Sequence, residues 1–113
     1  MVHDEALAAR FRAGVEGIAG LSERRMMGGL CFFVNGHMIG GTDRAKSGAG
    51  RFMFRVGKGN QALADRLTGG EPVIQGGRRM SGFYFVDAAA CDAAVLRDWL
   101  SLALRHAAGL PPK

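Results

Sequence analysis

Cysteine is scarce in this sequence of 113 residues, which contains only Cys31 and Cys91. Neither lies in a Cys-x-x-Cys motif or in a cluster with the spacing of metal ligands, so the sequence predicts no metal site. His3, Asp4 and Glu5 follow the first residues, and no apolar run of signal-peptide length comes after them. We therefore expect two reduced thiols in a cytoplasmic protein.

Long hydrophobic runs are missing as well. The longest stretches without a charge contain glycines and fall short of the about 20 residues that span a bilayer, so no membrane segment is expected. Glycine is plentiful instead: its 18 residues, roughly twice the usual share, fall between apolar runs, as is typical of turns. A chain of this length has room for one hydrophobic core, so we expect a single domain over residues 1–113.

Four apolar residues near the N-terminus recur at helical spacing and predict one buried helix face: Leu7, Phe11, Val15 and Ile18. Asp4 can cap this helix, and Gly17 and Gly20 can end it. A short segment over residues 22–27 follows and can be extended.

The next strand, residues 30–34, is apolar on both faces, which predicts a central strand that is covered on both sides. Asn35-Gly36 is a strong hairpin signal because both residues tolerate a positive φ. We expect the return strand over residues 37–41 and a polar, glycine-rich loop over residues 42–50.

In the second half of the chain the pattern predicts a strand over residues 51–56 and a short helix over residues 60–68. Two strands over residues 72–75 and 78–86 and a long helix over residues 92–108 follow. Asn60 and Asp92 can cap the two helices. Leu63 and Leu67 are expected on the inner face of the short helix. Four aromatic residues each lie on the apolar face of their predicted element, so we expect them to share one core: Phe32, Phe54, Phe85 and Trp99.

Tight turns between neighbouring strands favour antiparallel pairing, with the helices mainly on one face of the sheet. The fold class is therefore predicted as α+β, with two layers and an antiparallel sheet of about five strands. The expected order is a helix, three or four strands, a helix, two strands and a helix.

Residues 57–62 fit a Gly-x-Gly-x-x-Ala pattern after a strand and before a helix, the setting of a dinucleotide-binding loop. The helix is too short for the usual crossover, and no parallel strand with a ribose-binding acid follows. We therefore predict no dinucleotide site and no cofactor. A weaker anion site at Lys58, Gly59 and Asn60 stays open.

The net charge of +5 is concentrated in residues 21–80, which hold ten Lys and Arg against four Asp and Glu. A basic surface can attract anionic partners. It can also be a solvated strand surface that keeps the domain soluble, and this is the interpretation that we favour. Four arginines in two pairs are candidate nucleic-acid contacts: Arg24, Arg25, Arg78 and Arg79. Tyr84 could supply an exposed aromatic ring, with Phe83 and Phe85 in the core.

Catalysis has little support in the sequence. His3, His37 and His106 each have an ordinary structural setting, and the sequence shows no base and orienting group that would activate a nucleophile. Cys31 alternates with core residues and is expected to be inert, and Cys91 precedes a helix N-terminus, which could lower its pKa. We expect no enzyme activity.

Four ordered segments resemble the N-terminal domain family of the TfoX/Sxy competence regulators: residues 24–32, 34–38, 54–57 and 79–83. The first is similar to the family's basic-Met-Phe-Gly-Gly-x-x-Phe signature, with Met27 in place of the usual Phe. The signature positions are Met26, Gly28, Gly29, Phe32, Asn35 and Gly36. The helix with Trp99 and the end at residues 110–113 are similar to small single-domain members.

The resemblance implies a two-layer α+β fold with an antiparallel sheet. In the full-length bacterial regulators this domain precedes a second, helical domain, and those proteins act with the cyclic-AMP receptor protein in transcription. The sequence matches the first domain alone, and the family offers no catalytic residues to carry over. We expect a binding module with a protein partner in transcriptional regulation. Direct nucleic-acid or phosphate binding is the second hypothesis, and a small-molecule enzyme is the third.

Overall fold

The computed structural model describes residues 5–26 and 28–111. Its helices are α1 (Glu5–Gly14), α2 (Gln61–Ala64) and α3 (Ala93–Ala108), with 3₁₀ turns at Lys58–Asn60 and Ala88–Ala90. Its strands are β1 (Leu21–Met26), β2 (Gly29–Val34), β3 (His37–Arg44), β4 (Gly50–Arg55), β5 (Gly70–Gln75) and β6 (Arg78–Asp87). The predicted cap Asp4, the signature position Met27 and the last two residues lie outside the described part.

The strands form a six-stranded sheet in the order β1-β2-β3-β4-β6-β5, and every pair of neighbours is antiparallel. The α+β class and the order of elements are confirmed. The sheet has six strands, not about five, because residues 21–26 pair fully with β2 as an edge strand. The predicted loop over residues 42–50 is shorter than expected, since β3 continues to Arg44.

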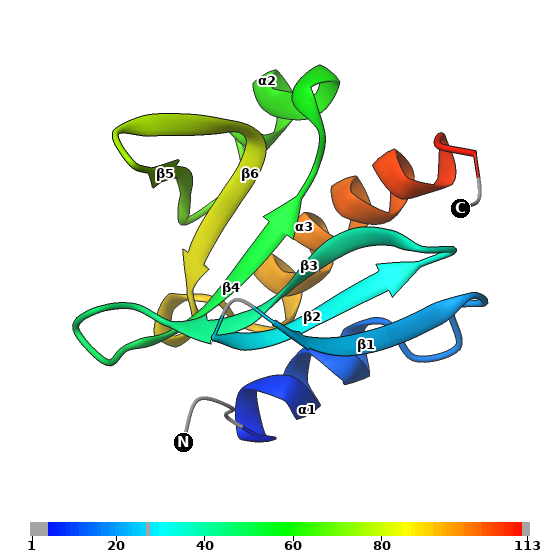
Figure 1. The fold of residues 1–113 in the computed structure, drawn as a ribbon, viewed down its shortest axis with the longest axis horizontal. Coiled ribbons are helices and arrows are strands. Elements are labelled where there is room, and N and C mark those ends of the chain that lie inside the picture. Colours follow the sequence, from blue (N-terminus) through cyan, green and yellow to red (C-terminus); the bar gives the residue numbers. More distant parts are fainter. Residues whose placement is uncertain (1–4, 27, 112–113) are drawn as a thin grey trace.

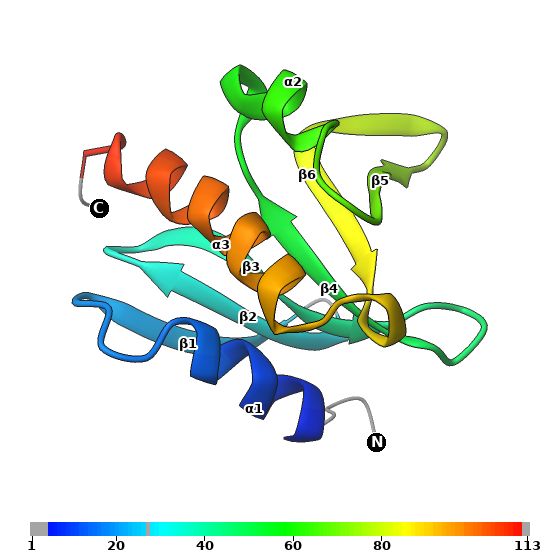
Figure 2. The ribbon, with the colours of Figure 1, turned by 180° about the vertical axis from the view of Figure 1, so that it is seen from behind.

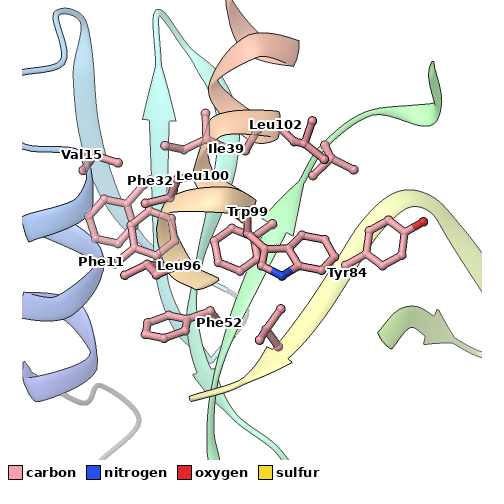
Figure 3. Packing of buried hydrophobic residues seen from close by; sticks show 14 of the residues in the cluster. Phe11, Val15, Phe32, Ile39, Phe52, Tyr84, Leu96, Trp99, Leu100 and Leu102 are labelled. Atoms are coloured by element: carbon pink, nitrogen blue, oxygen red, sulfur yellow. The ribbon is translucent and has the colours of Figure 1, made fainter. Parts of the chain in front are cut away.

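The two longer helices, α1 and α3, lie on the same face of the sheet, behind it in Figure 1 and in front of it in Figure 2. The hydrophobic core fills the space between them and the sheet (Figure 3). The rings of Phe11 and Phe32 stack with their centroids 4.3 Å apart, and Trp99 lies 5.6 Å from Phe54 and 5.3 Å from Tyr84. Aromatic pairs at these distances stabilise the core beyond the area that they bury.

The predicted core positions Phe83 and Phe85 are wrong, since both are only partly buried and neither belongs to the core cluster. Phe85 points to the opposite face of the sheet, and Tyr84 takes its place in the core, 1% exposed. The register explains the exchange, because Tyr84 lies directly opposite the core residue Phe54. In a run of four apolar residues, alternation cannot decide which pair faces inward.

Two further apolar residues that were expected inside are exposed. Ile18 is 37% exposed because α1 ends at Gly14, before the residue can complete the buried face. Leu63 is 44% exposed because α2 has a single turn, in which Ala64 is the buried residue.

The turns are largely as the sequence predicts. Asn35 and Gly36 have φ angles of 52° and 84°, as a two-residue hairpin turn of this kind requires. Asp92 caps α3 by accepting a hydrogen bond of 2.9 Å from the backbone N–H of Val95. Asn60 does not cap α2, since its side-chain amide instead donates to the carbonyl oxygen of Val56 at 2.9 Å.

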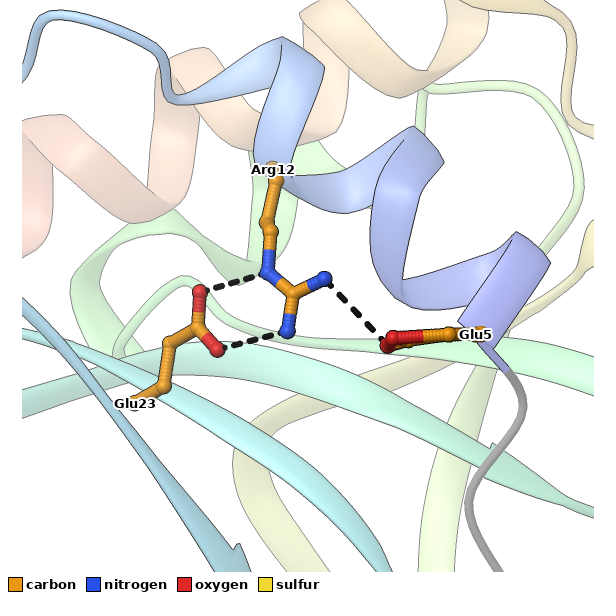
Figure 4. A network of polar contacts seen from close by, with 3 residues as sticks. All are labelled: Glu5, Arg12 and Glu23. Carbon is orange, nitrogen blue, oxygen red and sulfur yellow. Dashed lines mark hydrogen bonds and ion pairs between the residues drawn. The ribbon is translucent and has the colours of Figure 1, made fainter.

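An exposed ion pair ties α1 to β1 (Figure 4). The guanidinium of Arg12 donates to both carboxylate oxygens of Glu23, at 2.7 and 2.8 Å, and lies 3.4 Å from Glu5. Surface pairs contribute about 0–1 kcal/mol each, so this contact orients the helix more than it stabilises the fold.

Candidate functional site

The candidate site is the sheet face that points away from α1 and α3. Cys31, Gly41, Met53 and Phe85 lie directly opposite one another across β2, β3, β4 and β6, so they share this face. In the part of the chain that the structure describes, no helix covers it (Figures 1 and 2). We call it the open face. As predicted, β2 is a central strand whose six residues are all buried, although no described helix covers it on this face.

A hollow of about 220 Å³ lies on the open face. Its lining includes four sulfur-bearing side chains and two further apolar ones: Met26, Cys31, Met53, Met80, Val73 and Phe85. We call it the sulfur hollow. Because its lining comes from both edge strands, β1 and β5, the sheet must curl around its open face. This curl explains why Val73, on an edge strand, is only 1% exposed.

A fixed arginine forms one wall of the sulfur hollow. Arg51 donates to both carboxylate oxygens of Asp43, at 2.8 and 3.2 Å, and its guanidinium lies 3.5 Å from the centre of the Phe85 ring. The two-point ion pair and the ring contact together hold the side chain in one position. Phe85 therefore supports a charged wall of the open face and not the core.

The Arg51–Phe85 wall also borders a second hollow, of about 170 Å³. The other lining residues are mostly small, apart from the two acidic residues Glu71 and Asp87. We call it the acidic hollow. The open face therefore carries two adjacent depressions of different chemistry.

Both cysteines are free, as predicted, and both are buried, with exposed fractions of 4% for Cys31 and 1% for Cys91. Burial raises the pKa of both thiols, and the nearby Asp43 raises the pKa of Cys31 further. The expected lowering of the Cys91 pKa is wrong, because desolvation outweighs the effect of Arg10. Neither thiol is a thiolate at neutral pH, which removes them as ready nucleophiles.

We predict that thiol reagent will titrate two groups per chain in the unfolded, non-reduced protein and react only slowly with either in the folded protein. The reason is that the reaction needs a thiolate that the reagent can reach, and burial both disfavours the thiolate and blocks the reagent. Titration with and without denaturant measures this directly. A count of zero after unfolding would show that the cysteines are oxidised.

The loop after β4 lacks the features that a dinucleotide site needs beyond its glycines. The helix that follows has four residues, and both neighbours of β4 are antiparallel to it. Gly59 has no atom within 4 Å of where a Cβ would lie, so glycine is not required there for close approach. Lys58 is exposed beside it. The absence of a dinucleotide site stays a prediction.

The candidate arginines come from opposite ends of the strand order, β1 and the β5–β6 hairpin. The guanidinium of Arg24 lies 5.1 Å from the centre of the Phe33 ring on the open face, and Arg25, the next residue on the strand, points to the other side. Arg79 donates to the hydroxyl of Tyr84 at 3.1 Å, and Arg78 is exposed. The predicted exposed ring of Tyr84 is wrong, since this ring is buried.

His37 and His106 lie near the C-terminal end of α3, whereas His3 is outside the described residues. His37 is 7% exposed, and its Nε2 is hydrogen-bonded to the carbonyl oxygen of Pro111. The ring of His106 packs against Gly57, where a Cβ would lie 2.3 Å from it. Burial lowers the pKa of His106, and the nearby Arg55 and His37 lower it further.

The lowered pKa of His106 predicts a loss of stability in mild acid. The unfolded chain binds a proton at this residue near pH 6.5, whereas the folded chain binds it only at lower pH. Because the unfolded state holds more protons in that interval, the free energy of unfolding should decrease as the pH falls below about 6.5. Urea unfolding between about pH 7.5 and 5.5 measures this, and His106→Gln should flatten the curve. An equally steep decline in the variant would show that other groups cause it.

Among residues 5–26 and 28–111, no three His, Cys, Asp or Glu side chains are grouped so that they could hold a metal ion. No helix in the same residues is long and apolar enough to cross a membrane.

Comparison with known families identifies a match over most of the chain. The model of the TfoX N-terminal domain matches residues 13–107, which is most of the chain. The chain belongs to the TfoX N-terminal domain family. No curated protein and no solved structure was found to match it.

In this TfoX N-terminal domain, the signature residues build the two hairpins that shape the open face. Gly28 has a φ of 77° in the β1–β2 turn, and a Cβ on Gly29 would lie 1.9 Å from the carbonyl oxygen of Thr42. Phe32 lies in the core and Met26 lines the sulfur hollow. Most signature positions are therefore structural.

Proposed function

We propose that this TfoX N-terminal domain is a regulatory module that binds a protein partner through the open face of its sheet. The observation that carries the proposal is the sulfur hollow on a sheet face that no described helix covers. The membership of the family supports regulation, and its resemblance to the competence regulators supports transcription as the process.

The size of the sulfur hollow favours a partner side chain over a free small molecule. A cavity of roughly 150 Å³ holds a benzene ring, whereas pockets for drug-sized ligands measure about 300–1,000 Å³. At about 220 Å³, the hollow fits one large apolar side chain. Three methionines in its lining favour the same reading, because their flexible thioethers adapt to a protein surface.

The proposal is tested by blocking the hollow. Met80→Glu places a carboxylate at its rim, and Ala94→Glu, on the exposed surface of α3, is the matched control. Partners that are retained from lysate of the native cells by the unmodified domain should be retained by Ala94→Glu and lost by Met80→Glu. Met26→Glu, on the opposite rim, repeats the test independently. Retention of the same partners by both rim variants, with unchanged melting temperatures, would refute the proposal.

Direct nucleic-acid binding is the second candidate, favoured by the net charge of +5 and by the contact of Arg24 with Phe33. A gel-shift titration at several salt concentrations separates the two functions, because phosphate contacts give a steep dependence on salt. We expect no shift at physiological salt. A specific, salt-sensitive shift that Arg24→Ala weakens would favour the nucleic-acid function.

A further inference from the structure

We propose that the partner segment presents two side chains together: an apolar one for the sulfur hollow and a lysine or arginine for the acidic hollow beside it. The proposal rests on the function proposed above and names the chemistry of its partner. The proposed basic side chain is the opposite of what the net charge of +5 alone would suggest, which is an acidic partner.

The geometry of the wall between the hollows is the first argument. Arg51 and Phe85 line both hollows, so the two depressions lie on either side of one stacked pair. Since Asp43 binds the guanidinium of Arg51 at two points, the positive charge of the wall is already matched. A group that enters the acidic hollow therefore meets the charge of the other lining residues.

The charge of the acidic hollow is the second argument. Glu71 and Asp87 are both exposed, and among the described residues that line the hollow they are the ionisable ones besides Arg51. One oxygen of Asp87 accepts a hydrogen bond of 3.2 Å from the backbone N–H of Ala89, which holds the carboxylate in place. An acidic side chain here would face two carboxylates, whereas an ammonium or guanidinium would be attracted to both.

The range of electrostatic forces explains why the local charge decides. At physiological salt, exposed charges are screened beyond about 8 Å, so lysines and arginines far from the hollow have little effect inside it. Two basic residues flank the loop that lines it: the guanidinium of Arg44 donates to the carbonyl oxygen of Gly48 at 2.7 Å, and Lys46 is exposed. Neither lines the hollow, whereas the carboxylates of Glu71 and Asp87 do. A volume of about 170 Å³ is also sufficient for a guanidinium group and the end of its aliphatic chain. Hydrophobic contact in the sulfur hollow would supply affinity, and the acidic hollow would supply selectivity.

A selection of phage-displayed random peptides tests the proposal. The folded domain is the bait, and the parallel bait carries Glu71→Gln with Asp87→Asn, which keeps size, hydrogen-bonding groups and the cap at Ala89. We expect the unmodified domain to enrich peptides that combine a large apolar residue with a nearby Lys or Arg. The double variant should lose the basic preference and bind the best such peptide about tenfold more weakly.

Peptide variants and a third bait separate the possible outcomes. Replacing the peptide's Lys or Arg with Gln should weaken binding to the unmodified domain but have little further effect on the double variant. If the selected peptides show no preference for Lys or Arg, and Met80→Glu no longer binds them, this inference is wrong and the proposed function stands. If no peptide is enriched, or if the peptides bind Met80→Glu as well as the unmodified domain, both proposals are wrong.

Discussion

Replacing Gly82 with alanine should lower the free energy of unfolding by about 2–5 kcal/mol. The φ of this residue is 82°, a conformation that costs an L-residue roughly 1–2 kcal/mol. A Cβ there would also lie 2.7 Å from the carbonyl carbon of Gly57 and 2.9 Å from the backbone nitrogen of Lys58, and overpacking of this kind adds about 1–3 kcal/mol. Urea unfolding of the two proteins gives the difference.

The backbone around Gly82 cannot easily move to relieve the clash. Its carbonyl oxygen accepts hydrogen bonds from the backbone N–H groups of Val56 at 2.8 Å and Gly57 at 3.2 Å. Its own N–H donates to the side chain of Gln61 at 2.6 Å. These bonds join a bulge in β6, where its pairing with β5 shifts register, to the loop that follows β4.

Gly77→Ala is the matched control, because Gly77 has a similar φ of 77° but no atom within 4 Å of the added Cβ. It should show the conformational cost alone, about 1–2 kcal/mol. Equal losses in the two variants would mean that the contact between the bulge and the β4 loop is not formed as described.

Trp99→Ala should lower the free energy of unfolding by about 3–5 kcal/mol, the range for truncation of a buried aromatic residue. The side chain is fully buried, contacts Phe54 and Tyr84, and donates from its indole nitrogen to the carbonyl oxygen of Thr68 at 3.0 Å. For a domain of this size the melting temperature should fall by about 10–20 °C.

Leu63→Ala provides the control for Trp99→Ala, since Leu63 is 44% exposed and lies outside the core cluster. Changes of this type at the surface are usually within about 0.5 kcal/mol. Thermal unfolding of both variants measures the contrast. An unchanged melting temperature for Trp99→Ala would show that the core assignment is wrong.

Local chemistry made most of the fold predictable from the sequence. Asn35-Gly36 needs no distant partner to form its turn, and Asp92 caps α3 through a bond three residues away. The faces of β6 were not predictable, because Phe83 to Val86 are all apolar and only the register with β4 decides which residues point inward. Asn60 was wrongly expected to cap because a backbone carbonyl four residues earlier competes for its side chain.

The candidate site was visible only in fragments. Arg51 and Met53 alternate in the sequence with Phe52 and Phe54, a pattern that predicts a common face away from the core, and the structure confirms it. It could not show that Met26 and Val73, from opposite edges of the sheet, reach one hollow, since that depends on the curl of all six strands. The basic residues suggested an anion-binding surface, whereas the depressions of the open face are apolar and acidic.

Site-specific photo-crosslinking in living cells tests the central claim most directly. A photoreactive phenylalanine analogue at Met80 reports on the rim of the sulfur hollow, and the same analogue at Ala94 reports on the helical side. We predict a discrete protein adduct from position 80, lost when Met26→Glu is added, and none from position 94. Adducts from position 94 alone, or adducts to nucleic acid from position 80, would contradict a protein-binding role for the open face.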